Sequence, residues 1–181
     1  MIVGLQFEVE NKRNNYLKKI FESIDLSVYY WEIVSDQVLY EENGKEEQGL
    51  FDTCIIDELK NRGLFKPNTA ERMKKGFYDS HVLIDGKSIE KAIERDSYYF
   101  IFLDLKAYSN NEVWGNIETY EDFVESNCEL IFLCVDSAFI EIYGKNEMVL
   151  QTIHDNCIKN NFDAIKVISD DDAKGKSVVA F

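Results

Sequence analysis

The stretches YYFIFLDL (residues 98–105) and LIFLCVD (residues 130–136) decide the fold of this 181-residue chain. Both are apolar at almost every position, so neither has the alternation expected of a strand with one face in water. Continuous apolar runs of this length are typical of strands in the middle of a sheet that is covered on both faces. We therefore expect these two segments to be the central strands of the sheet.

The segments around these strands predict hairpins and single helices. Residues 119–122 (TYED) have the pattern of a helical capping box, and Asn146 is placed to cap a longer helix. Residues 139–143 follow the second apolar run after only two residues, which predicts a hairpin. Residues 178–180 are expected to add a last strand. This arrangement favours an α+β fold, with helices packed on a mixed, mainly antiparallel sheet.

The first half of the chain is harder to interpret. Residues 28–34 and 38–40 are rich in β-branched and aromatic side chains, and the polar Ser35 and Asp36 between them predict a hairpin turn. Residues 50–80 are the least readable part of the chain. Asp52 could cap a short helix that ends at Gly63, and residues 69–75 are a second short helix candidate. We interpret about residues 41–80 as a variable insertion. At this length the whole chain, residues 1–181, is expected to form a single domain.

The chain is acidic, with 34 Asp and Glu against 20 Lys and Arg and a formal net charge of −14, yet 45% of its residues are hydrophobic. That apolar content predicts a compact fold rather than a disordered acidic tail. Residues 26–60 and 96–136 each carry nine acidic residues against two and one basic residues. Such a surplus repels nucleic acid and anionic lipid and favours basic partners, although acidity also serves solubility alone.

The four cysteines form neither a CxxC pair nor a dense framework. In a chain of this length they predict reduced, mostly buried thiols and a reducing compartment. The N-terminus lacks the features of a signal peptide, and no apolar run approaches the ~20 residues that a membrane helix needs. We expect a cytoplasmic protein without a membrane or nucleic-acid partner.

Several segments resemble a known bacterial family. Residues 4–11 (GLQFEVEN), 99–108 (YFIFLDLKAY), 117–123 (IETYEDF) and 134–137 (CVDS) together resemble the family catalogued as domain of unknown function 2691, from endospore-forming Gram-positive bacteria. The resemblance covers most of the chain except roughly residues 40–80. It implies a small cytoplasmic bacterial protein, and it brings no activity or catalytic residues with it.

The segment from Tyr108 to Glu125 combines aromatic and acidic side chains and contains no basic residue. Aromatic anchors rimmed by one sign of charge are typical of a surface that binds a basic protein. In the alternative interpretation, Trp114 covers the core and a solvated helix follows it. The candidate partner-binding residues are Trp114, Glu118, Tyr120, Glu121, Asp122 and Glu125.

Asp104 and Asp136 are the candidates for a reaction site, because each is expected to end a central strand. If the strands are neighbours, the two carboxylates could converge and hold a divalent cation. A simpler interpretation is that each strand ends in a polar residue where the chain meets water. His154 and Cys157 have a spacing that could serve zinc, but Cys157 falls on an apolar stripe and is better explained by core packing.

The sequence therefore favours a non-enzymatic protein-interaction module that binds a basic protein surface, as an antagonist or an immunity protein does. No catalytic residues, metal ligands or cofactors are assigned. The first alternative is a small metal-dependent hydrolase that uses Asp104 and Asp136. The second alternative is a self-associating structural protein, in which exposed aromatic side chains are buried in a homodimer.

Overall fold

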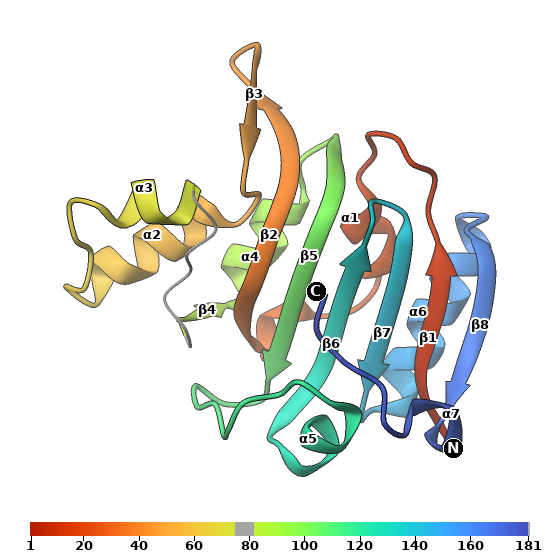
Figure 1. The fold of residues 1–181 in the computed structure, drawn as a ribbon. Helices are drawn as coiled ribbons and strands as arrows, with labels where there is room; N and C mark the ends of the chain where they lie inside the picture. The colour runs from red at the N-terminus through yellow and green to blue at the C-terminus, as the bar shows by residue number, and fades with distance from the viewer. Residues whose placement is uncertain (75–81, 181) are drawn as a thin grey trace.

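A computed structural model describes residues 1–74 and 82–180 of the chain (Figure 1). Its centre is an eight-stranded sheet in which every described pairing is antiparallel. The α+β fold is confirmed, and the described strands include no parallel pair. The strands are β1 (Ile2–Glu8), β2 (Tyr30–Glu42), β3 (Lys45–Gln48), β4 (Leu83–Asp85), β5 (Tyr98–Tyr108), β6 (Cys128–Val135), β7 (Phe139–Gly144) and β8 (Asp163–Ser169).

The strands follow the order β3-β2-β5-β6-β7-β1-β8, and β4 pairs with the other end of β2. The two apolar stretches form β5 and β6, neighbours in the middle of the sheet, as the sequence predicts. The β6–β7 hairpin is confirmed as well, with Val135 opposite Phe139.

Helices cover both faces of this sheet. Figure 1 shows α1, α4 and α6 behind it, whereas α5 and the C-terminal segment lie in front of it and α2 and α3 lie beyond β2. The helices are α1 (Tyr16–Ile20), α2 (Asp52–Asn61), α3 (Thr69–Lys74), α4 (Gly86–Ile93), α5 (Tyr120–Glu125), α6 (Glu147–Lys159) and α7 (Asp170–Ala173), with one 3-10 turn at Leu26–Val28.

Each face of the sheet has its own core. The larger core gathers aromatic rings such as Phe7, Trp31 and Phe132 beneath α1, α4 and α6. The smaller core includes Tyr108 and Tyr143, which pack with α5, α7 and the C-terminal segment. Because both faces are dry, β5 and β6 need apolar side chains at nearly every position.

The helix caps are confirmed at both predicted positions. Thr119 Oγ1 accepts a hydrogen bond from the N–H of Asp122 at 3.2 Å, and the Asp122 carboxylate returns to the Thr119 N–H, which completes the capping box of α5. Asn146 Oδ1 accepts the N–H of Met148 at 2.9 Å at the start of α6. These contacts satisfy backbone donors that the helix itself leaves free.

The predicted hairpin at residues 28–40 is wrong, because one continuous strand, β2, runs from Tyr30 to Glu42 through the expected turn. The register shifts between Ile33 and Ser35 and again between Gln37 and Val38, which marks two irregularities in its pairing with β5. Asp36 is fully buried, and its Oδ2 accepts the N–H of Phe51 at 2.6 Å. Ser35 and Asp36, which the sequence pattern places in a turn, therefore lie inside the strand, and Asp36 makes a buried contact with the segment that follows β3.

The C-terminal segment also differs from the prediction. Residues 178–180 form no strand, and an isolated bridge between Thr119 and Ser177 attaches this segment to the start of α5. Asp170 opens the short helix α7. The residues of the predicted insertion that the structure describes form β3, α2 and α3. Their status as an insertion stays a prediction.

Candidate functional site

Trp114 lies on the loop between β5 and α5, and 59% of its surface is exposed. Its N–H donates to Asn127 Oδ1 at 3.1 Å, and its indole Nε1 donates to Glu112 Oε2 at 3.3 Å. Asn127 Nδ2 donates in turn to the Glu112 carbonyl at 2.7 Å and to Asn110 Oδ1 at 3.1 Å. Asn127 thus holds the loop while the ring faces solvent. The alternative in which Trp114 covers the core is wrong.

Tyr120 is not a second exposed ring. Only 4% of it is exposed, and it packs between Phe123 and Tyr143 in the smaller core. Its hydroxyl donates to Asp170 Oδ1 at 2.9 Å. Burial, together with this hydrogen bond to a carboxylate, raises the pKa of Tyr120 to about 12. Tyr120 therefore joins α5 to α7 and is unable to act as an anchor for a partner.

The predicted carboxylates differ in what they are free to do. Asp122 accepts the N–H groups of Glu118 and Thr119, and its side-chain and backbone hydrogen bonds with Thr119 lower its pKa. Its carboxylate caps the N-terminus of α5. Glu118, Glu121 and Glu125 are exposed, although Glu121 also accepts the N–H of Gly175 at 2.9 Å.

We use the name Trp114 surface for six exposed residues of this loop and of α5, which are Glu112, Trp114, Glu118, Glu121, Val124 and Glu125. A basic side chain from another segment lies at one border of it. Lys145 Nζ donates to the Ser126 carbonyl at 2.5 Å and sits 5.3 Å from the centre of the Phe123 ring. It stabilises the C-terminal end of α5, where carbonyl groups point outward.

Asp104 and Asp136 do not form a common site. Asp104 lies in the middle of β5, opposite Leu133, and is 1% exposed, so the prediction that it ends a strand is wrong. Asp136 lies in the exposed turn after β6 with a positive φ of 52°. In the described part of the chain, no group of three or more His, Cys, Asp or Glu side chains is arranged to hold a metal ion.

Asp104 belongs instead to a buried polar network on the front face of the sheet. Lys106 Nζ lies 3.0 Å from Asp104 Oδ1, and Tyr108 Oη donates to Glu32 Oε2 at 2.9 Å. The N–H of Ala180 reaches Asp104 Oδ2 at 3.4 Å, so the C-terminal segment covers the network. Burial raises the pKa of Asp104, while Lys106 opposes that shift. The network is closed to a substrate.

The cysteines are free thiols, as predicted, and Cys128, Cys134 and Cys157 are buried. Burial raises the pKa of Cys128 and of Cys157 to about 12, and that of the half-buried Cys54 to about 11. All three thiols are therefore protonated at neutral pH. None of them is a ready nucleophile, because the reactive form is the thiolate.

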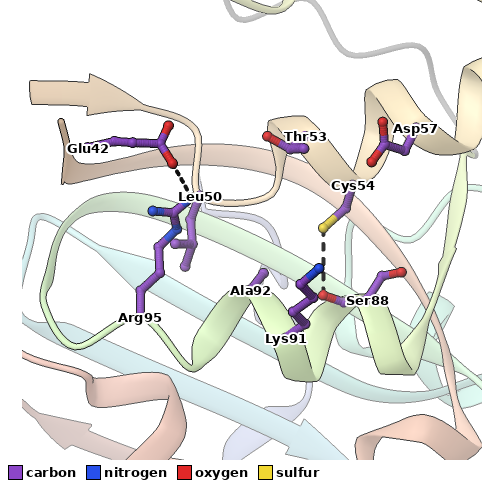
Figure 2. Close-up of a pocket in the computed structure, with 9 residues that line it drawn as sticks. All are labelled: Glu42, Leu50, Thr53, Cys54, Asp57, Ser88, Lys91, Ala92 and Arg95. Atoms are coloured by element: carbon purple, nitrogen blue, oxygen red, sulfur yellow. Dashed lines mark hydrogen bonds and ion pairs between the residues drawn. The ribbon is translucent and has the colours of Figure 1, made fainter.

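A cavity of about 470 Å³, which the sequence analysis does not predict, lies between α2, α4 and the end of β2 (Figure 2). Five of its nine lining residues lie within residues 41–80, the predicted insertion. Charged residues of both signs, two hydroxyls and a thiol surround an apolar floor. The cavity is lined by Glu42, Leu50, Thr53, Cys54, Asp57, Ser88, Lys91, Ala92 and Arg95.

Within the described residues, no helix is both long enough and apolar enough to cross a membrane. Comparison with known proteins gives one curated relative, the uncharacterised protein YncE of Bacillus subtilis (strain 168). It is 23% identical over 168 residues, which cover 93% of this chain and 92% of the relative. No solved structure matches the chain significantly.

The model of a protein family of unknown function, DUF2691, matches residues 2–70 and 59–179. These two matches together span nearly the whole chain, including the central strands and both capped helices. The chain therefore belongs to the bacterial DUF2691 family.

Proposed function

We propose that the chain is a non-enzymatic protein-interaction module whose Trp114 surface binds a basic protein. The observation that carries this proposal is the exposure of Trp114 on a loop that hydrogen bonds already hold in place. An exposed indole ring presents a large apolar surface that a partner can bury. Tryptophan is also enriched among the few residues that dominate interface energetics.

The charges around Trp114 define the chemistry of the partner. Between Lys106 and Lys145 the sequence holds eight acidic residues and neither Lys nor Arg. The carboxylates of Glu118, Glu121 and Glu125 are exposed within this span. Collective negative charge accelerates encounter with a positive surface and disfavours acidic partners.

The hydrogen bonds of Asn127 support the proposal because they reduce the conformational entropy that the loop would lose on binding. A loop that must be ordered on binding lowers affinity, because each immobilised residue loses conformational freedom. Asn127 already fixes the backbone at Trp114 and Glu112. Binding can then proceed by electrostatic steering, followed by burial of the ring against the partner. A module of this kind would act as an antagonist that covers a basic protein, as an immunity protein does.

The test is capture of partners by the immobilised protein, with Trp114→Ala and a matched control compared at low and high salt. Met148→Ala is the control, because Met148 is an exposed apolar residue (80%) on α6, behind the sheet. We expect a basic protein that the wild type and Met148→Ala retain at low salt, that Trp114→Ala loses, and that 0.5 M salt releases, since screening shortens the reach of surface charges to roughly 4 Å. Equal recovery by all three proteins, or recovery that salt leaves unchanged, would contradict the proposal.

A further inference from the structure

We propose that the cavity between α2 and α4 is a binding site for a small zwitterion, a molecule that carries both a carboxylate and an ammonium group. Its volume of about 470 Å³ lies within the range of small-molecule sites. The site is separate from the Trp114 surface, so this proposal does not depend on the proposed function.

The first step rests on two charges of opposite sign, carried by exposed side chains from two different helices that line the cavity. Lys91 on α4 and Asp57 on α2 both line the cavity. Figure 2 shows the Lys91 side chain reaching from α4 toward α2, which carries Asp57 beyond Cys54. Among residues 1–74 and 82–180, neither charge has a hydrogen-bond or ion-pair partner, and the two do not pair with each other. A ligand with one charge of each sign could satisfy both.

The other two charges in the wall already satisfy each other. Arg95 Nη2 lies 3.3 Å from Glu42 Oε1, and the guanidinium sits 4.2 Å from the centre of the Tyr40 ring. This pair lies at one end of the group of lining residues (Figure 2). Of the four charged groups in the wall, Lys91 is therefore left to bind a carboxylate and Asp57 to bind an ammonium group.

The remaining lining fits the body of such a ligand. Leu50 and Ala92 supply apolar surface for methylene groups, and the Thr53 hydroxyl is available beside them. Cys54 Sγ lies 3.6 Å from the Ser88 carbonyl, in the geometry of a thiol that donates a weak hydrogen bond. Because this thiol remains protonated, the cavity holds a ligand without offering it a thiolate nucleophile.

The test measures the binding of linear ω-amino acids of increasing length, from glycine to 6-aminohexanoate. Binding is measured by calorimetry on the full chain. These probes vary the distance between carboxylate and ammonium group while their charges stay the same. We expect affinity to peak at one chain length, and the dicarboxylate and the diamine of similar length to bind about tenfold more weakly, because each leaves one wall charge unpaired.

Variants locate the binding. Lys91→Gln and Asp57→Asn are each expected to weaken the best ω-amino acid about tenfold, since each removes one charge-assisted contact. Lys87→Gln is the matched control, because Lys87 is exposed on the same helix and does not line the cavity. The double exchange Asp57→Lys/Lys91→Asp restores one charge of each sign and should recover binding. Circular dichroism checks that every variant is folded.

Three outcomes would overturn the proposal. The first is that no ω-amino acid binds at concentrations up to about 10 mM. The second is that the dicarboxylate or the diamine binds as well as the zwitterion. The third is binding that Lys91→Gln and Asp57→Asn leave as strong as Lys87→Gln does.

Discussion

At the scale of single residues, Asp36 carries the clearest chemical signature in the chain. It is buried between β2 and the start of α2, and burial raises its pKa from 3.8 to about 7, although the N–H of Phe51 opposes this shift. The folded state therefore holds the Asp36 proton more tightly than the unfolded state does. Its contribution to stability is fully present below about pH 4 and is lost as the pH rises to about 7.

The variant Asp36→Asn tests this coupling, because an amide keeps an acceptor for Phe51 and does not titrate. All other titrating groups are shared, so the difference in unfolding free energy between the two proteins isolates Asp36. We expect the wild type to lose roughly 2–4 kcal/mol relative to Asp36→Asn between pH 4 and pH 8. Urea titrations at several pH values measure it, and two parallel pH profiles would contradict the assignment.

The buried pair of Asp104 and Lys106 makes a second prediction at this scale. In Lys106→Met the Asp104 carboxylate loses its cation inside the smaller core, and the unfolding free energy should fall by about 3 kcal/mol. The double variant Asp104→Leu/Lys106→Met removes both charges and should be more stable than the single variant. If the double variant is the less stable of the two, the pair is not the source of the effect.

At the scale of elements, the cap of α6 offers a direct measure of local stability. Asn146 Oδ1 accepts the N–H groups of Met148 and Val149, at 2.9 and 3.4 Å. Asn146→Ala should lower the unfolding free energy by about 1 kcal/mol, whereas Asn146→Asp keeps an acceptor and should cost much less. Thermal melts of the two variants provide the comparison, and an equal loss in both would show that the side-chain acceptor is not what matters.

The elements that could be predicted are those whose signal is local. Continuous apolar runs identified β5 and β6, and the spacing of Thr119 and Asp122 identified the start of α5. The hairpin within residues 28–40 was wrong because Asp36 is buried by contact with Phe51, fifteen residues away, and no local pattern reveals such a contact.

In the candidate site as well, features that depend on one segment could be predicted, and features that depend on contacts between distant segments could not. Acidic residues around Trp114 could be found from one segment, because charge and aromatic content are properties of the sequence itself. The burial of Tyr120 depends on Tyr143 and Asp170, from two other elements. The cavity of Asp57 and Lys91 was missed because its walls come from segments more than thirty residues apart.

At the scale of the whole molecule, the net charge of −14 has a consequence for stability. Like charges on a compact surface repel one another, and added salt screens that repulsion. We expect the melting temperature to rise as NaCl increases from 0.05 to 0.5 M at pH 7.5. A melting temperature that falls over this range would show that specific ion pairs outweigh the general repulsion.

Self-association stays a prediction at this scale. If the Trp114 surface buries itself in a homodimer, the measured mass should rise with protein concentration, and Trp114→Ala should remain a monomer. Sedimentation over a hundredfold range of concentration distinguishes this arrangement from a monomer that reserves the surface for another protein.

The most direct measurement of the central claim is site-specific photo-crosslinking in the bacterium that encodes the protein. A crosslinking side chain replaces Trp114 in one strain and Met148, the exposed control behind the sheet, in another. We predict that position 114 captures a basic protein under gentle lysis and that position 148 does not. If both positions capture the same proteins, or if position 114 captures only acidic ones, the Trp114 surface is not the binding site for a basic partner.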